Sequence, residues 1–140
     1  MDRNPAAVFD AHCDTATRLM QGDEIDIGTR LDSGHVDLPR MREGGIFAQV
    51  FACWVDPDMP GERWNSNTLK MIARLRKAIE APGEGIEVAC SGSRIEDLAS
   101  LGKIAAVIGV EGGHAIGRSL EALEKLRENG VRCMTLTWNN

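Results

Sequence analysis

The stretch that decides the fold class is KIAAVIGVE, Lys103–Glu111. Between its charged ends the run is entirely apolar, which predicts a strand buried on both faces, as in a parallel sheet. A second run, Ile46–Val55 (IFAQVFACWV), is apolar except for Gln49 and predicts a strand of the same kind. Helical patterns separate such runs, and alternating strands and helices indicate βαβ units with right-handed crossovers.

The remaining segments extend this alternation along the chain. Short apolar runs predict strands at 7–12, 46–55, 86–90, 103–111 and 131–137. Apolar residues at helical spacing and capping signals predict helices at 15–21, 36–45, 68–80, 93–100 and 120–129. The polar segment 22–35 follows neither period, so we expect it to be irregular.

Several helices carry more detailed signals. Asp37 is the expected N-cap of the second helix, Ser93 and Glu96 have the spacing of a capping box, and the last helix should follow Ser119 and end at Gly130. The buried stripes are expected to consist of Leu69, Ile72, Leu75 and Ile79 in the third helix and of Leu120, Leu123 and Leu126 in the last.

The number of strands indicates which α/β fold this is. A (β/α)8 barrel takes about 250 residues, so four or five strands in 140 residues make up about half of one. The sequence also stops at Asn140, soon after a buried strand and without a helix to cover it. We therefore expect residues 1–140 to be a partial barrel domain. It would be the N-terminal half of a (β/α)8 TIM-type barrel with parallel strands, truncated on its C-terminal side.

Composition and charge exclude several classes of function. The chain has 16 basic against 21 acidic residues, a formal net charge of -5 and no Lys/Arg cluster. This argues against binding to nucleic acid or to an anionic membrane surface. No apolar run is long enough to span a bilayer, and no secretory signal is visible, so we expect a cytoplasmic protein.

The four cysteines agree with that location. Cys13, Cys53, Cys90 and Cys133 are widely spaced, without a C-x-x-C pair. Because most of them stand in apolar, strand-like runs, we expect reduced and mostly buried thiols. A disulfide framework or a cysteine-based zinc site is the less favoured alternative.

Candidate metal ligands stand at the ends of two predicted strands. In FDAHCDT (9–15), His12 and Asp14 are two residues apart, so in an extended strand they share one face while Cys13 points to the other. Glu111 ends the strongest strand and is followed by two glycines that let the backbone turn. The carboxyl ends of parallel strands meet at one rim, where these three side chains could hold zinc or another divalent ion.

Structural roles are the alternatives for each of these residues. His12 and Asp14 could form a hydrogen-bonded pair or cap a turn, and Glu111 could be a helix N-cap or a salt-bridge partner. His114 is more typical of a hydrogen-bonding loop residue than of a ligand, and His35 of a polar cap or a surface residue.

Four blocks of the sequence resemble one family. DAHCDT (10–15), HVDLPRMREGGIFAQVFACWV (35–55), KIAAVIGVEGGHAIGRSLEALEKL (103–126) and GVRCMTLTWNN (130–140) occur in the order seen in the membrane (renal) dipeptidase family of zinc peptidases. The resemblance covers nearly all of this chain, but only the N-terminal part of a family member.

The resemblance implies a (β/α)8 barrel with two zinc ions at its carboxyl rim. His12 and Asp14 match the pair that holds one zinc, and Glu111 matches the carboxylate that bridges both. Two further histidines for the second zinc and a catalytic acid, an aspartate, come from later strands of the family and are not present in this chain. The implied activity is hydrolysis of dipeptides, with tolerance of a D-residue at the C-terminal position.

Trp138 is a departure from the commoner family pattern. Many members have a histidine there, in an LTH motif that contacts the substrate, whereas other members resemble the LTWN of this chain. Trp138 is therefore a candidate substrate-binding residue that would supply an apolar wall. A rim residue that packs under a following helix is the equally open alternative.

Other functions stay open at this point. Another two-metal barrel hydrolase would act on a lactone, an ester or a cyclic amide through the same site. A doubly wound α/β binding domain without metal would have G-x-G-x-x-G after the first strand, but HCDTAT (12–17) has no glycine there. The literal 140-residue chain could be inactive alone, with open strand edges that favour self-association. A homo-oligomer of the full-length protein is also compatible with the sequence.

Overall fold

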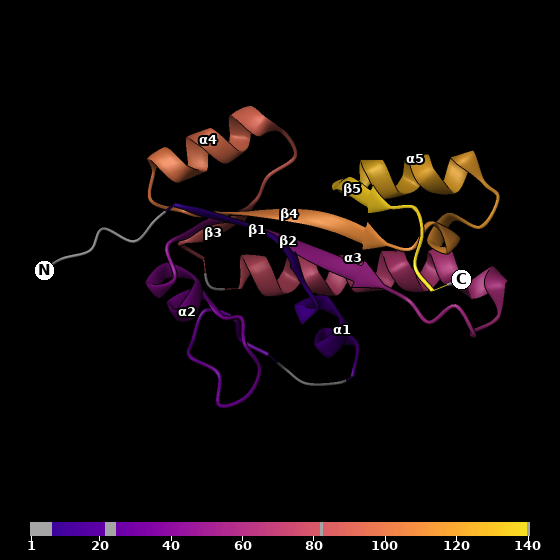
Figure 1. Cartoon of the computed structure of the whole chain (residues 1–140), viewed down its shortest axis with the longest axis horizontal. Coiled ribbons are helices and arrows are strands. Elements are labelled where there is room, and N and C mark those ends of the chain that lie inside the picture. Colours follow the sequence, from indigo (N-terminus) through magenta and orange to yellow (C-terminus); the bar gives the residue numbers. More distant parts are fainter. Residues whose placement is uncertain (1–6, 22–24, 82, 140) are drawn as a thin grey trace, which may run out of the picture.

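One parallel sheet organises the computed structural model, which describes residues 7–21, 25–81 and 83–139 (Figure 1). The strands are β1 (Val8–Cys13), β2 (Ile46–Trp54), β3 (Ile86–Val88), β4 (Ile104–Glu111) and β5 (Val131–Thr135). β2 lies between β1 and β4. The other side of β4 is shared, because β3 pairs with its first residues and β5 with its last ones. All the pairings are parallel, which confirms the predicted α/β class.

Helices cover one face of this sheet and the amino end of the other. They are α1 (Thr15–Met20), α2 (Leu38–Glu43), α3 (Trp64–Glu80), α4 (Gly92–Ser100) and α5 (Leu120–Glu128), with short 3-10 segments η1 (Gly61–Arg63) and η2 (Gly113–Ile116). α1, α2 and α3 lie on one face, α4 crosses the amino end of the other, and α5 flanks β5 (Figure 1). No described helix combines the length and the apolarity needed to cross a membrane.

The core has two parts because β4 buries both of its faces. Ile104 and Ile108 join the main cluster under α1 and α3, together with Phe51 and Leu75. The neighbouring Ala105 faces the other way, into a small second cluster with Leu98 of α4 and with Ala48 and Ala89. The unbroken apolar run of Lys103–Glu111 is thus explained by a strand that packs on both sides.

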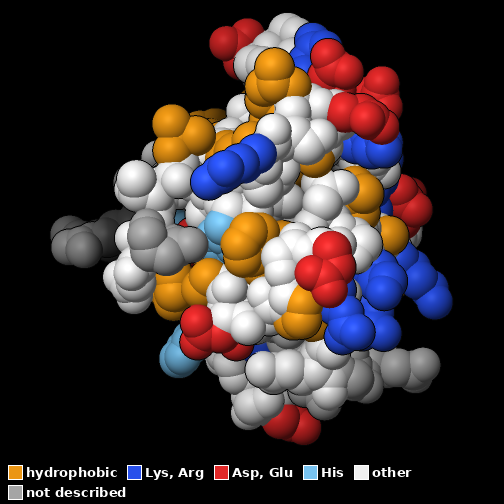
Figure 2. Space-filling view, turned by 90° about the vertical axis from the view of Figure 1, so that its right-hand side faces the viewer, with side chains coloured by type: hydrophobic (Ala, Val, Ile, Leu, Met, Phe, Trp, Pro, Cys, Tyr) orange, Lys and Arg blue, Asp and Glu red, His pale blue; other side chains and the backbone are white. Residues whose placement is uncertain are grey.

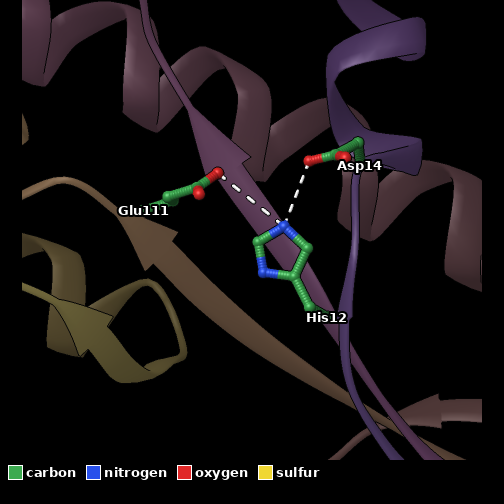
Figure 3. A group of neighbouring side chains, drawn as sticks. All are labelled: His12, Asp14 and Glu111. Atoms are coloured by element: carbon green, nitrogen blue, oxygen red, sulfur yellow. Dashed lines mark hydrogen bonds and ion pairs between the residues drawn. The ribbon is translucent and has the colours of Figure 1, made fainter. Parts of the chain in front are cut away.

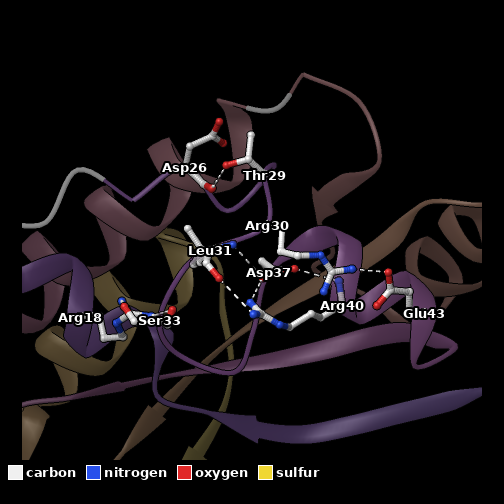
Figure 4. Close-up of polar contacts among 9 residues, drawn as sticks. All are labelled: Arg18, Asp26, Thr29, Arg30, Leu31, Ser33, Asp37, Arg40 and Glu43. Atoms are coloured by element: carbon white, nitrogen blue, oxygen red, sulfur yellow. Dashed lines mark hydrogen bonds and ion pairs between the residues drawn. The ribbon is translucent and has the colours of Figure 1, made fainter.

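Side-chain hydrogen bonds to the backbone hold the irregular segment before α2 (Figure 4). Asp37 is fully buried and caps α2, accepting from the backbone N–H of Arg40 at 2.8 Å and of Leu31 at 3.2 Å. The Arg40 guanidinium forms an ion pair with Asp37 and donates to the Leu31 carbonyl at 3.0 Å. Burial by itself would raise the pKa of Asp37, but these backbone N–H groups and Arg40 together lower it. The predicted N-cap is confirmed.

Two predicted helix starts are wrong. α3 begins at Trp64 rather than at Thr68, whose buried hydroxyl donates to the Trp64 carbonyl at 2.9 Å, a bond within the helix. α4 is capped by Ser91, which accepts from the Arg94 N–H at 3.2 Å, so Ser93 stands inside the first turn. Local spacing could not distinguish two serines that are two residues apart.

The last helix follows its predicted cap but not its predicted stripe. Ser119 caps α5 as expected, accepting from the Ala122 N–H at 3.1 Å. Leu126 is buried, whereas Leu120 is 76% and Leu123 38% exposed, because α5 turns Ala122 and Leu126 inward instead. The stripe predicted for α3 is confirmed at Ile72, Leu75 and Ile79, which are buried, and Leu69 packs partly against the same cluster.

The cysteines are free thiols in different surroundings. Cys13 and Cys53 are buried, Cys90 is half-buried and Cys133 is exposed, so the prediction of mostly buried thiols holds for two of the four. Burial, with a smaller contribution from Cys13 and Cys133, raises the pKa of Cys53 to about 12. That thiol stays protonated and unreactive in the folded chain.

Candidate metal centre

His12, Asp14 and Glu111 meet at the carboxyl end of the sheet, as predicted (Figure 3). His12 lies in β1, Asp14 follows that strand as the first residue before α1, and Glu111 ends β4. The His12 Nε2 is 3.2 Å from Asp14 Oδ1 and 3.7 Å from Glu111 Oε2. One nitrogen or oxygen atom of each residue lies within 4.8 Å of the others.

This convergence depends on β2, because β1 and β4 are not neighbours. Trp54 of β2 pairs in register with Glu111, and Ala52 pairs with Gly109 in the row before. Residues two apart share a face, so the row next to Glu111 on its own face consists of two small residues. A Cβ at Gly109 would lie 2.9 Å from the Cys133 Sγ. The row before Glu111 therefore carries little side-chain bulk, and the side chains of His12 and Glu111 approach each other across β2.

The structural alternatives for these residues hold only in part: neither carboxylate is a cap, whereas Glu111 does form an ion pair with His12. Asp14 holds the N-cap position of α1 but makes no side-chain cap bond, and the residue at the cap of η2 is Gly112 rather than Glu111. His12 and Asp14 do form the hydrogen-bonded pair considered above. Cys13 points to the opposite face and is buried in the main cluster, as expected.

Among the described residues, no lysine or arginine neutralises the carboxylates of the site. Within the described residues neither Asp14 nor Glu111 forms an ion pair with a lysine or an arginine, and His12 is their common partner. The side chains of His12, Asp14 and Glu111 are 47%, 71% and 22% exposed, so all three are accessible. Two carboxylates with one imidazole leave an excess of negative charge at this rim.

The donor set fits a divalent cation. Imidazole nitrogen and carboxylate oxygen are ligands of zinc and of other borderline divalent ions. Ligands about 2.0–2.2 Å from a tetrahedral zinc lie about 3.3–3.6 Å from one another. The separations of 3.2 and 3.7 Å from His12 Nε2 are close to that range. The arrangement can therefore close around an ion with small side-chain movements.

The other two histidines lie outside this cluster. His114 Nε2 donates to the Val55 carbonyl at 2.8 Å, and its ring packs edge-on against Trp64 at 5.5 Å. His35 is exposed in the segment before α2. Among the described residues, His12, Asp14 and Glu111 are the group with the geometry of a metal site.

A pair of tryptophans stands beside the three residues. Trp138 is 39% exposed, and its ring lies 5.1 Å from that of Trp54, tilted by 52°. Trp54 is the register partner of Glu111 and was not singled out from the sequence. Its place as the last residue of an apolar strand, at the rim, was the available signal. In Figure 2, which looks onto the carboxyl ends of the strands, a partly visible histidine lies next to a hydrophobic side chain.

Comparisons with known proteins agree on one family. A family model for membrane dipeptidases, peptidase family M19, matches residues 3–140. An uncharacterized dipeptidase from Schizosaccharomyces pombe is 30% identical over 96% of this chain and 36% of its own length. The chain thus spans little more than a third of that relative.

Solved structures match over nearly the whole chain. The metallopeptidase called dipeptidase AC, of family M19, is 28% identical with a TM-score of 0.82, over 96% of this chain and 43% of its own. A metallopeptidase from Rhodobacter sphaeroides, liganded with a phosphinate mimic of the dipeptide L-Ala-D-Ala, is 26% identical with a TM-score of 0.84. That match covers 98% of this chain and 47% of the other. The predicted partial barrel agrees with both.

Proposed function

Because this chain belongs to the membrane dipeptidase family, peptidase family M19, we propose that the protein carrying it hydrolyses dipeptides at a metal centre built on His12, Asp14 and Glu111. The observation that carries the proposal is the approach of these three side chains within 4.8 Å at the strand ends. It is here that α/β barrels place their catalytic residues. Residues 1–140 would form the first part of the barrel domain.

In this proposal the centre holds two zinc ions. His12 and Asp14 would hold one ion, and Glu111 would serve both. Further ligands of the second ion would lie outside residues 1–140. Two observations support this: one imidazole and two carboxylates match the donor chemistry of zinc, and the two carboxylates pair with no lysine or arginine among the described residues.

The side chains have separate roles in binding. Bound zinc supplies Lewis-acid polarisation of a carbonyl and a water of lowered pKa. His12 presents its Nε2 to both carboxylates, so this nitrogen would be its ligand atom. Glu111, in the central strand β4, has the least exposed side chain of the three and hence the most restricted position.

A dipeptide would bind beside the tryptophans. Trp138 is the proposed substrate contact, an apolar wall that packs on Trp54 next to Glu111. The ligand of the Rhodobacter sphaeroides relative, a mimic of L-Ala-D-Ala, supports a dipeptide with a D-residue at the C-terminal position.

The test is a substrate panel with metal removal. The full-length protein is assayed with L-Ala-D-Ala and L-Ala-L-Ala, and with lactones, esters and cyclic amides. We expect hydrolysis of the dipeptides, loss of activity on dialysis against a chelator, recovery with zinc, and two zinc ions per chain by elemental analysis. Faster turnover of lactones would assign a different hydrolase, and activity that survives the chelator would contradict the metal centre.

A further inference from the structure

The turn that follows Glu111 contains an interaction that the proposed metal centre does not itself use. Gly112 has a φ of 94°, and His114 lies in the short segment η2. The His114 Nε2 lies 2.8 Å from the carbonyl oxygen of Val55, the first residue after β2. A carbonyl only accepts, so Nε2 carries the proton and donates it. The other nitrogen, Nδ1, is buried without a partner among the described residues.

The imidazole is fixed on several sides. Its ring packs edge-on against Trp64 at the start of α3, 5.5 Å away. A Cβ at Gly112 would lie 2.2 Å from the His114 Cε1 and 2.4 Å from its Nδ1, so the ring occupies space that only a glycine leaves free. The backbone N–H of Gly112 donates to the Thr135 carbonyl at 2.9 Å, which ties the same turn to β5. The ring therefore has little freedom to move.

This interaction continues the pairing of β2 with β4. The last register pair of these strands is Trp54 with Glu111, and the next residues are Val55 and Gly112. Beyond that pair, the bond from His114 to Val55 joins the two strand ends. The distance from His12 to Glu111 depends on this relation, because His12 reaches Glu111 across β2.

We infer that His114 is a positioning residue, which holds the Glu111 carboxylate at the distance from His12 that the metal centre requires. This rests on the proposed metal centre but adds a residue that is not a ligand. Groups that orient metal ligands typically change metal affinity by about 10–100-fold when they are removed. We expect a loss of that size when the Nε2 donor is removed.

Three variants of the full-length protein separate positioning from folding. His114→Leu removes the donor and keeps an apolar side chain. His114→Gln keeps an N–H donor the same number of bonds from the backbone as Nε2. Leu98→Ala is the matched control for lost stability, because Leu98 is fully buried in the second cluster under α4. Zinc affinity is measured by competition with a chromophoric chelator, and the free energy of unfolding by urea titration.

We expect zinc affinity to fall about 10–100-fold in His114→Leu and to recover in His114→Gln. The control should lose stability with unchanged affinity. Unchanged affinity in His114→Leu, or an equal loss in the control or in the glutamine variant, would overturn the inference. Crystal structures without metal test it independently, since His114→Leu should show Glu111 displaced from His12. If the wild type binds no zinc, the proposed function fails, while these structures still decide the role of His114.

Discussion

The carboxylates at the two ends of the sheet have different ion-pair partners. At the amino end, Glu87 of β3 forms ion pairs with Lys103, just before β4, and with Arg94 of α4. The hydrogen bond from Lys103, with the Arg94 guanidinium also contributing, lowers the pKa of Glu87. At the carboxyl end, Asp14 and Glu111 have no such partner among the described residues and share His12. A carboxylate neutralised by lysine and arginine stabilises the fold, whereas carboxylates without them are available to a cation.

The strongest test exchanges one carboxylate for an amide at each end. Glu111→Gln keeps the shape of the side chain but removes charge from the proposed metal centre. We expect dipeptide hydrolysis by the full-length protein to fall roughly a thousandfold or more, with reduced zinc content. Glu87→Gln is the matched control and should leave hydrolysis unchanged. Equal losses of hydrolysis in the two variants would show that the two ends of the sheet do not differ in function.

The next test concerns the most buried of the paired carboxylates. Asp37→Ala removes the cap of α2 and leaves the Arg40 guanidinium, partly buried, without its partner. We expect a loss of roughly 3–5 kcal/mol in the free energy of unfolding, measured by urea titration of the full-length protein. Zinc binding in the folded fraction should persist, because Asp37 is not part of the proposed metal centre. A loss below about 1 kcal/mol would show that the ion pair offsets little more than its own desolvation.

The pH dependence of the free energy of unfolding tests the charge of Asp37, with a smaller expected effect. The pKa of Asp37 is lowered in the folded chain, so its contribution to stability is present above its usual value of 3.8 and is lost as the pH falls below it. Asp37→Asn keeps a capping side chain without the charge. We expect its free energy of unfolding to fall less steeply than that of the wild type below about pH 4. Parallel curves would mean that Asp37 does not contribute to acid unfolding.

The smallest effect is expected from the exposed ion pairs of the amino end. Lys103 and Arg94 are 30% and 42% exposed, so salt screens their attraction to Glu87. Glu87→Gln should destabilise the protein less than Asp37→Ala does, and the difference from wild type should shrink as salt is added. Thermal melts at low and high salt measure it. A difference that is independent of salt would indicate a packing role for Glu87 instead.

Local patterns in the sequence were sufficient for the parallel sheet and for finding the three residues of the proposed metal centre. His12 and Asp14 were assigned to one face by the period of two in a strand, and Glu111 by its place after an unbroken apolar run. Their convergence then follows from a general property of parallel sheets, since all carboxyl ends lie at one rim. Asp37 and Ser119 were recognised as caps because capping depends on neighbouring residues.

Short-range periodicity therefore determined, from the sequence by itself, the strands, most helices and the end of the sheet where the proposed ligands stand. Tertiary structure decided the rest. Leu120 and Leu123 are exposed because the orientation of α5 depends on the sheet it packs against. The small residues Ala52 and Gly109 in the row before Glu111, and the bond from His114 to Val55, join segments far apart in the chain. Register and close packing between distant segments create these contacts, and no local pattern encodes them.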